Sequence, residues 1–395
     1  MAVESGRTDA ASVRETSVPW SAVVCLSLLT FLLVGLEFLP VSLLTPIAQD
    51  LAITEGQAGQ AITMSGILAV LTSLFGNGLL RRLDRRLVVL LYTAILVVSS
   101  LAVALAPDFT VFLLGRALVG IAIGGFWSLS TAILARLASG PDLPKAIAIL
   151  QVGTALALVL AAPLGSLLGA LIGWRGTFLV TVPIGLVALV WQAMVIPALP
   201  PTEAVSPRRM LGLLSTPKFA LGMAATGLAF MGTNALSIYL RPFLESVTGL
   251  DVAVLSLALL SIGVGGLAGL GLVGLLLARH LNAALVGIPA VLAVLALLLM
   301  ALGPLAGPTL ALLVLWGLVS TPIPVIWNTW MAAIIPNDLE AGGGLQVALI
   351  QTAIAGGALS SGLLFDLVGW WASFSLSALL LSGAAIFAHL ATPRR

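Results

Sequence analysis

The fold of this chain is decided by a type of segment whose first copy, at residues 21–44, reads SAVVCLSLLTFLLVGLEFLPVSLL. The segment is apolar apart from a few small polar residues and one charged residue, Glu37. A helix of about twenty such residues spans the roughly 30 Å hydrocarbon core of a bilayer. We therefore expect residues 21–44 to cross a membrane as one helix.

Segments of this kind recur along all 395 residues, of which 60% are hydrophobic and 8% are charged. That composition cannot supply a solvated surface to a soluble globule, so it predicts an integral membrane protein. Strands of a membrane barrel would be shorter and would alternate apolar with polar residues, so we expect an all-α protein. The twelve predicted spans are 21–44, 57–80, 87–106, 110–134, 146–170, 177–197, 219–242, 252–277, 284–302, 309–333, 342–365 and 373–391.

Basic residues gather in alternate loops, which is typical of the cytoplasmic side of a membrane protein. Only Arg175 and Arg241 fall in loops on the other side. We therefore expect both termini in the cytoplasm, and the net charge of +2 gives no reason to expect a nucleic-acid partner. The basic residues predicted to be cytoplasmic are Arg7, Arg14, Arg81, Arg82, Arg85, Arg86, Arg136, Lys145, Arg208, Arg209, Lys218, Arg279, Arg394 and Arg395.

The second half of the sequence repeats the first at an offset of about 200 positions, which indicates two pseudo-symmetric six-helix halves. A stretch rich in Pro, Ser and Arg separates them. We expect a cytoplasmic tail at 1–20, a six-helix bundle at 21–197, a cytoplasmic linker at 198–218, a second bundle at 219–391 and a short tail at 392–395. The matching positions include Glu37 with Asn234, Arg81 with Arg279, Gln151 with Gln351, and Gly173-Trp174 with Gly369-Trp370.

Glu37 and Arg116 are ionisable residues inside predicted spans, where a charge costs at least a few kcal/mol and marks a functional site by default. Each lies eight residues from an expected outer helix end, so both are about 12 Å deep at 1.5 Å per residue and can share a layer. An ion pair or hydrogen-bonded pair would lower the cost of burial. Two alternatives stay open: the pair only pins two helices, or Arg116 bonds to main-chain carbonyls. If Glu37 binds a proton from outside and releases it to the cytoplasm, proton entry can drive alternating access.

Three motifs carry a family resemblance. Residues 37–48 (EFLPVSLLTPIA), 115–124 (GRALVGIAIG) and 162–166 (APLGS) resemble the first-, fourth- and fifth-helix motifs of the drug:proton antiporter branch of the major facilitator superfamily. With 84–86 (DRR) and 125–128 (GFWS), the chain is most similar to bacterial purine ribonucleoside efflux pumps.

The resemblance implies the major facilitator fold, a bacterial inner-membrane location, a monomer without a cofactor, and export of purine ribonucleosides in exchange for protons. Glu37 and Arg116, the two isolated charges inside the spans, are the candidates for the coupling role. Efflux of sugars or of chloramphenicol-like drugs, a passive facilitator and a non-transporting sensor remain alternatives.

Amide and aromatic side chains inside the spans are candidates for substrate contact. Amides can bond base edges and ribose hydroxyls, and rings can stack on a base. Interhelical hydrogen bonds and an interfacial aromatic belt are the competing explanations. The candidate substrate-binding residues are Asn234, Gln151, Gln351, Trp127, Trp327 and Tyr239.

The loop after the second span departs from the superfamily pattern. Aligning its basic cluster, Arg81, Arg82, Arg85 and Arg86, puts Arg81 where an aspartate is usual and Asp84 where a glycine is usual. Asp84 therefore either replaces the usual charge relay of this loop or lies in a solvated turn.

Enzymatic and metal-binding functions are not supported. His280 and His389 are the only histidines and Cys25 is the only cysteine, so we expect no metal site and no intrachain disulfide.

Overall fold

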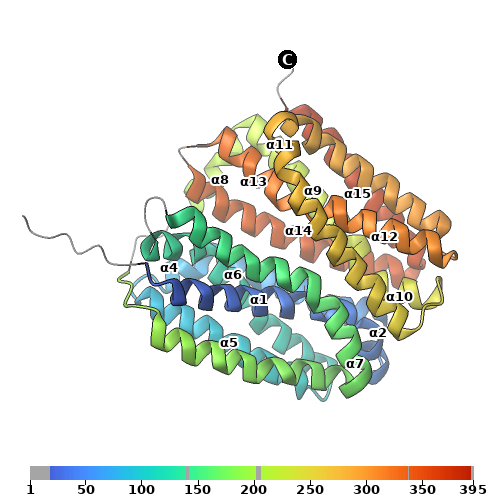
Figure 1. Ribbon diagram of the computed structural model, residues 1–395, viewed down its shortest axis with the longest axis horizontal. Helices are drawn as coiled ribbons and strands as arrows, with labels where there is room; N and C mark the ends of the chain where they lie inside the picture. Colours follow the sequence, from blue (N-terminus) through green and yellow to red (C-terminus); the bar gives the residue numbers. More distant parts are fainter. Residues whose placement is uncertain (1–17, 139–141, 202–205, 337, 393–395) are drawn as a thin grey trace, which may run out of the picture.

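The computed structural model describes residues 18–138, 142–201, 206–336 and 338–392. Almost all of them are helical, as the sequence predicts (Figure 1). The predicted tails at 1–20 and 392–395 lie almost wholly outside the described residues. The helices are α1 (Trp20–Ser42), α2 (Leu44–Asp50), α3 (Glu55–Leu71), the π-helix η1 (Thr72–Gly76), α4 (Asn77–Leu79), α5 (Arg85–Ala104), α6 (Phe109–Leu137), α7 (Leu143–Val195), α8 (Pro207–Gly212), the 3-10 helix η3 (Leu213–Ser215), α9 (Pro217–Ser237), α10 (Leu240–Ser246), α11 (Val252–Leu302), α12 (Ala306–Ser320), α13 (Ile323–Ile334), α14 (Leu339–Leu367) and α15 (Trp370–Ala391).

The predicted twelve crossings are present. Eleven helical stretches of the described chain are long and apolar enough to span a membrane. One of them, Lys145–Val195, has 51 residues, or about 77 Å at 1.5 Å per residue, which is more than twice the hydrocarbon thickness. It turns at Gly173, where φ is 73°, so it supplies two crossings. In α11 the corresponding turn lies at His280.

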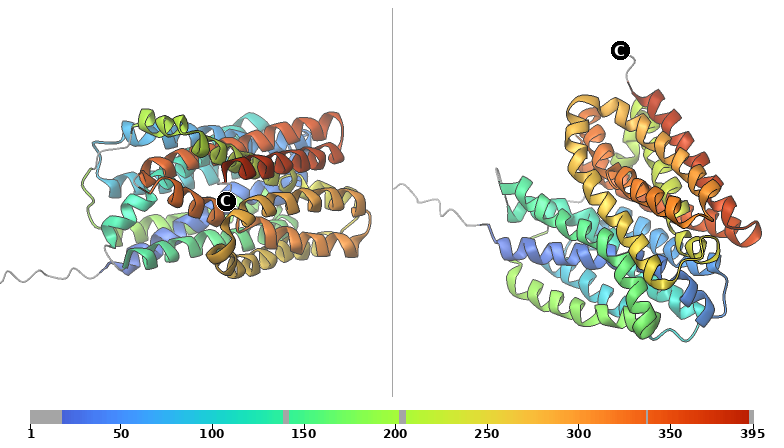
Figure 2. Two further views of the ribbon diagram at one scale, coloured as in Figure 1. Left: turned by 90° about the horizontal axis from the view of Figure 1, so that it is seen from above. Right: turned by 45° about the vertical axis from the view of Figure 1, so that its right-hand side comes forward.

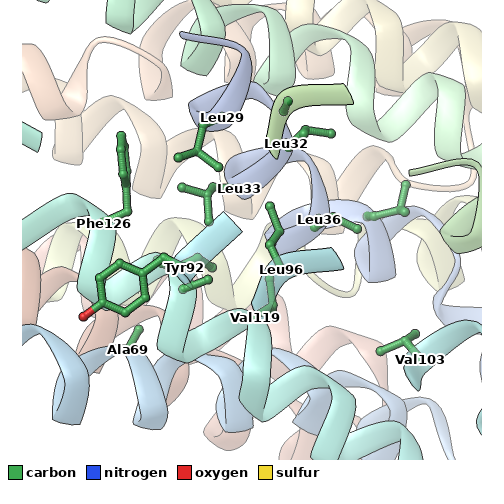
Figure 3. Close-up of a cluster of buried hydrophobic side chains, with 14 of the residues drawn as sticks. Leu29, Leu32, Leu33, Leu36, Ala69, Tyr92, Leu96, Val103, Val119 and Phe126 are labelled. Atoms are coloured by element: carbon green, nitrogen blue, oxygen red, sulfur yellow. The ribbon is translucent and has the colours of Figure 1, made fainter. Parts of the chain in front are cut away.

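The crossings form two bundles, each around its own core. The first core is built mainly from α1, α3, α5, α6 and α7, and Figure 3 shows part of it around Leu33, Tyr92 and Phe126. Ile238, Tyr239, Ile354 and Ala358 of the second half join this core where the halves meet. The second core is built from α9 to α15 and includes Phe243 and Trp316. The bundles lie at an angle and converge toward the end that carries α2 and α10 (Figures 1 and 2).

The sequence repeat is visible in the backbone and in the ring packing. Gly173 and Gly369 both have positive φ, at 73° and 117°, a conformation that favours glycine. Trp174 and Trp370, the residues that follow them, each meet a phenylalanine four positions on in a T-shaped pair, with ring centroids 6.3 Å and 5.6 Å apart. The two halves are therefore pseudo-symmetric.

We name the two ends of the molecule by what they carry. The terminal face is the end where α1 begins and α15 ends, and the far face is the opposite end, which carries the α1–α2 turn and α10. Asp108 and Asp251 cap α6 and α11 at the far face, each accepting from a main-chain N–H at 2.9 Å. These caps fix where both helices begin.

Candidate functional site

Arg116 is buried because α6 packs closely against α3. A Cβ on Gly120 or Gly124 would collide with the main-chain oxygens of Ser65 and Ala69, so glycine is needed for this approach. Arg116 is 1% exposed and points toward α1 and α3.

The Arg116 guanidinium is held by main-chain oxygens. It donates to the Leu36 oxygen at 2.6 Å, to the Glu37 oxygen at 3.0 Å and to the Ala61 oxygen at 3.4 Å. The Leu36 oxygen is available because Pro40, four residues on, has no N–H to donate to it. The side chains of Glu37 and Arg116 therefore do not pair in the described structure, and the alternative with main-chain carbonyls is the one observed.

The Glu37 carboxylate faces the other half of the molecule. Its Oε1 accepts a hydrogen bond of 3.2 Å from Nε2 of Gln351 on α14. Both residues are 5% exposed. The other amide atom, Gln351 Oε1, is buried and has no hydrogen-bond partner among the described residues. Sequence reasoning placed Gln351 with the substrate and did not predict this contact.

The far face is closed by hydrogen bonds between the halves. Asp366 at the end of α14 accepts from the Gly56 N–H at 3.0 Å and from the Thr54 hydroxyl at 2.5 Å, so its charge sits at the N-terminus of α3. The Tyr239 hydroxyl lies 3.1 Å from the Ala358 oxygen and 3.4 Å from the Gly56 oxygen. Tyr239, a predicted substrate ligand, is thus part of this closure.

Arg175 and Arg241, the two basic residues predicted on the non-cytoplasmic side, both have acidic partners at the far face. Arg241 donates to the oxygen of Ser42, the last residue of α1, and pairs with Glu245 at 2.9 Å. Arg175 pairs with Asp50 and stacks on Trp174, 4.2 Å from the ring centre. Hydrogen bonding from Arg175 lowers the pKa of the exposed Asp50 carboxyl. These partners explain why arginine is tolerated on this side.

A cavity of about 250 Å³ lies between the halves. Asn234, 9% exposed, is in its lining, and its Nδ2 donates to the Phe230 oxygen of its own helix at 2.9 Å. Trp316 also lines the cavity and donates to the Ser237 hydroxyl at 3.3 Å. The residues that line this cavity include Phe38, Phe230, Asn234, Ser237, Trp316 and Thr321.

The remaining substrate candidates lie in different places. Gln151 is exposed on the face of α7 whose later residues, Ala155 and Leu158, line the cavity. Trp127 is half-buried in a T-shaped contact with Phe126. Trp327 is 2% exposed and packs against Trp330 within the second core. The sequence reasoning missed Trp316, although its position seven residues inside the predicted span 309–333, away from the interface, was a usable signal.

Asp84 holds the start of the segment that joins the halves. Its carboxylate caps α5 through the Arg86 N–H at 2.8 Å and also accepts from the Leu199 N–H at 3.0 Å. The Arg85 N–H donates to the Leu199 oxygen at 2.8 Å, and Arg136 donates to the Pro200 oxygen at 2.6 Å. The Arg86 guanidinium donates to the Ala193 oxygen, while Arg81 and Arg82 are exposed.

Comparisons with known proteins agree with this architecture. The family model "Major Facilitator Superfamily" matches residues 26–358. The chain is 49% identical over 380 residues to the transcription regulatory protein OpdE of Pseudomonas aeruginosa, covering 95% of this chain and 94% of that protein. It is 39% identical over 358 residues to the purine ribonucleoside efflux pump NepI of Salmonella typhimurium, covering 91% and 90%.

Two solved structures share the fold. A bacterial homologue of the human lysosomal transporter Spinster, in an inward-facing and unoccupied conformation, superposes with a TM-score of 0.71 at 18% identity and covers 95% of this chain and 97% of its own. The human organic anion transporter MFSD10 superposes with a TM-score of 0.61 at 21% identity, covering 94% and 99%. The chain belongs to the major facilitator superfamily and is a multi-pass membrane transporter, not an enzyme.

Proposed function

We propose that this transporter exports purine ribonucleosides in exchange for protons, and that Glu37 carries the proton. The observation that supports this most is that Glu37 is the one buried acidic residue among the described side chains. It lies where the two halves meet, bonded to Gln351 of the second half. A carboxyl buried inside a membrane-spanning bundle is costly, so a role in transport is the default explanation for it.

The proposed cycle follows from the geometry around Glu37. The terminal face carries the clustered basic residues and is assigned to the cytoplasm. With the far face closed, Glu37 releases its proton toward the cytoplasm, and the positive charge of Arg116 stabilises the carboxylate that remains. Substrate then binds, and the far face opens. A new proton on Glu37 returns the empty carrier.

The cavity supports a planar, hydrogen-bonding substrate. Phe230 and Trp316 offer aromatic surface, and Asn234, Ser237 and Thr321 offer polar groups. Rings stack on a purine, and amide and hydroxyl groups can bond its edge or the ribose. The similarity to a purine ribonucleoside efflux pump points to the same class of solute.

Purified protein in proteoliposomes tests the proposal. With an acid interior, radiolabelled inosine should accumulate above its equilibrium level, and it should only equilibrate without a pH gradient. Accumulation of chloramphenicol or a sugar in place of inosine would reassign the substrate. Equilibration that ignores the pH gradient would show a passive facilitator.

A second candidate is a role in gene regulation, favoured by the 49% identity to a protein named as a transcription regulatory protein. The same assay separates the two. A sensor would bind a solute and show no flux with or without a pH gradient.

A further inference from the structure

We propose that Gln351 is a positioning residue that keeps the far face closed in both protonation states of Glu37. This inference rests on the proposed function, because it assigns the proton to Glu37. It gives Gln351 a role at the interface of the halves, apart from the substrate cavity.

The backbone around Gln351 is tightly fixed. On α3, Gly66 lies against α14, where an added Cβ would meet the Gln351 oxygen at 3.0 Å and the Ala355 Cβ at 2.7 Å. Thr63 of α3 donates to the Ala355 oxygen at 3.2 Å. The main chain of α14 is therefore packed tightly against α3 while the far face is closed, and in that state adjustment to a change at Glu37 falls to the Gln351 side chain.

The Gln351 amide has both a donor for the ionised Glu37 carboxylate and an acceptor for the protonated carboxyl. An ionised carboxylate only accepts hydrogen bonds, and Gln351 Nε2 donates to it in the structure. A protonated carboxyl must also donate. Half a turn of the amide about its last bond presents Oε1, the buried acceptor that has no partner among the described residues. The same two side chains can therefore stay bonded across the interface before and after the proton leaves.

A charged partner at this position would not allow both states. A cation would hold Glu37 ionised, and a second carboxylate would compete with it for the proton. Arg116 of α6 is the charged side chain beside Glu37 and donates to its main-chain oxygen, Ser65 of α3 accepts from the same guanidinium, and α14 presents the neutral Gln351. The neutral amide leaves Glu37 free to exchange its proton while the far face stays closed.

The test compares Gln351→Met, Gln351→Glu and the control Thr352→Val, whose native hydroxyl bonds within α14 to the Ala348 oxygen. Methionine keeps the length of the side chain but cannot donate. The pH midpoint of inosine accumulation should move up by about one unit, because the carboxylate loses the N–H that favours its ionised form. The control should keep the midpoint of the unchanged protein.

A second readout does not depend on transport. Cys25 is the only cysteine, so a Cys25→Ala background can carry spin labels at Thr110→Cys and Leu305→Cys, exposed far-face residues of the two halves. With Gln351 present, the distance between the labels should not change with pH. With Gln351→Glu, it should lengthen at high pH, where two adjacent carboxylates repel, and shorten at low pH.

Two results would overturn the inference. The first is a Gln351→Met profile with an unchanged pH midpoint and a raised KM for inosine, which would make Gln351 a substrate ligand. The second is a label distance that ignores pH in Gln351→Glu. That variant keeps the size of the native side chain and decides the matter if Gln351→Met fails to fold. Absence of pH-driven transport in the unsubstituted protein would instead contradict the proposed function, and the label distances would remain interpretable.

Discussion

Pro40 lies four residues after Leu36, and the Leu36 oxygen accepts a hydrogen bond of 2.6 Å from Arg116. A proline in a helix leaves the carbonyl four residues earlier without its usual donor. Arg116 supplies that donor from another helix. The charge buried on α6 and the proline on α1 are therefore parts of one structural unit beside Glu37.

This relationship predicts the effect of Arg116→Lys. A lysine cannot bridge three main-chain oxygens on two helices, so at least one buried carbonyl loses its partner, at about 1–3 kcal/mol. We expect lower thermal stability in detergent and at least a tenfold loss of inosine accumulation. In a Pro40→Ala background, residue 40 has a main-chain N–H that can donate to the Leu36 oxygen. Arg116→Lys should therefore lower the thermal stability by less in this background than in the native one. Equal losses in both backgrounds would show that the two positions act independently. Arg208→Lys, at an exposed position, is the matched control.

The far-face closure predicts that Asp366→Asn favours opening. The negative charge at the N-terminus of α3 contributes about 0.3–1 kcal/mol, and asparagine keeps the shape without that charge. The population with a long distance between labels at Thr110→Cys and Leu305→Cys should rise a few-fold. Asp251→Asn keeps the cap of α11 and removes the same kind of charge from a helix N-terminus within one bundle, so it should lower stability slightly and leave the distance unchanged. Equal distances in the two variants would rule out Asp366 as a latch between the halves.

The contacts of Asp84 predict that Asp84→Ala loosens the segment between the halves. The variant removes an N-cap, at about 1 kcal/mol, and also the acceptor for the Leu199 N–H. We expect faster tryptic cleavage at Arg208 and Arg209, measured by gel densitometry under native conditions. Asp108→Ala loses a cap only, and it should not change the cleavage rate. Equal cleavage in both variants would mean that Asp84 is only a helix cap.

The cavity predicts different effects for two tryptophans. Trp316→Leu removes a ring that lines the cavity and should raise the KM for inosine about tenfold, as expected for a lost stacking contact. Trp327→Leu should lower thermal stability and leave KM near its original value, because Trp327 is buried against Trp330. The opposite pattern would place the substrate beside Trp327, one of the six candidate substrate-binding residues of the sequence analysis.

The fold was predictable because hydropathy acts over whole segments. Twelve apolar runs fix twelve crossings, and the repeated Gly-Trp pairs at Gly173 and Gly369 mark the pseudo-symmetry without reference to any contact. The gaps between predicted spans at 171–176 and 278–283 contain the turns that the structure has at Gly173 and His280. Only the division of the longer helices needed the structure.

The site was predictable only in part. Depth along a helix placed Glu37 and Arg116 in one layer, but it could not say which atoms meet, because a guanidinium bonds main-chain and side-chain oxygens equally well. The consequence of Pro40 for Leu36 was available in the sequence and was missed. The contact between Glu37 and Gln351 joins residues 314 positions apart, and it depends on how the two halves dock, which no repeat pattern encodes.

The central claim is that Glu37 carries the coupled proton, and Glu37→Gln tests it most directly. Glutamine keeps the size and can still bond Gln351, but it cannot release a proton at physiological pH. In proteoliposomes with an acid interior, the variant should lose inosine accumulation while it retains exchange of labelled for unlabelled inosine at equal pH. Accumulation of inosine at the level of the unsubstituted protein would contradict the account.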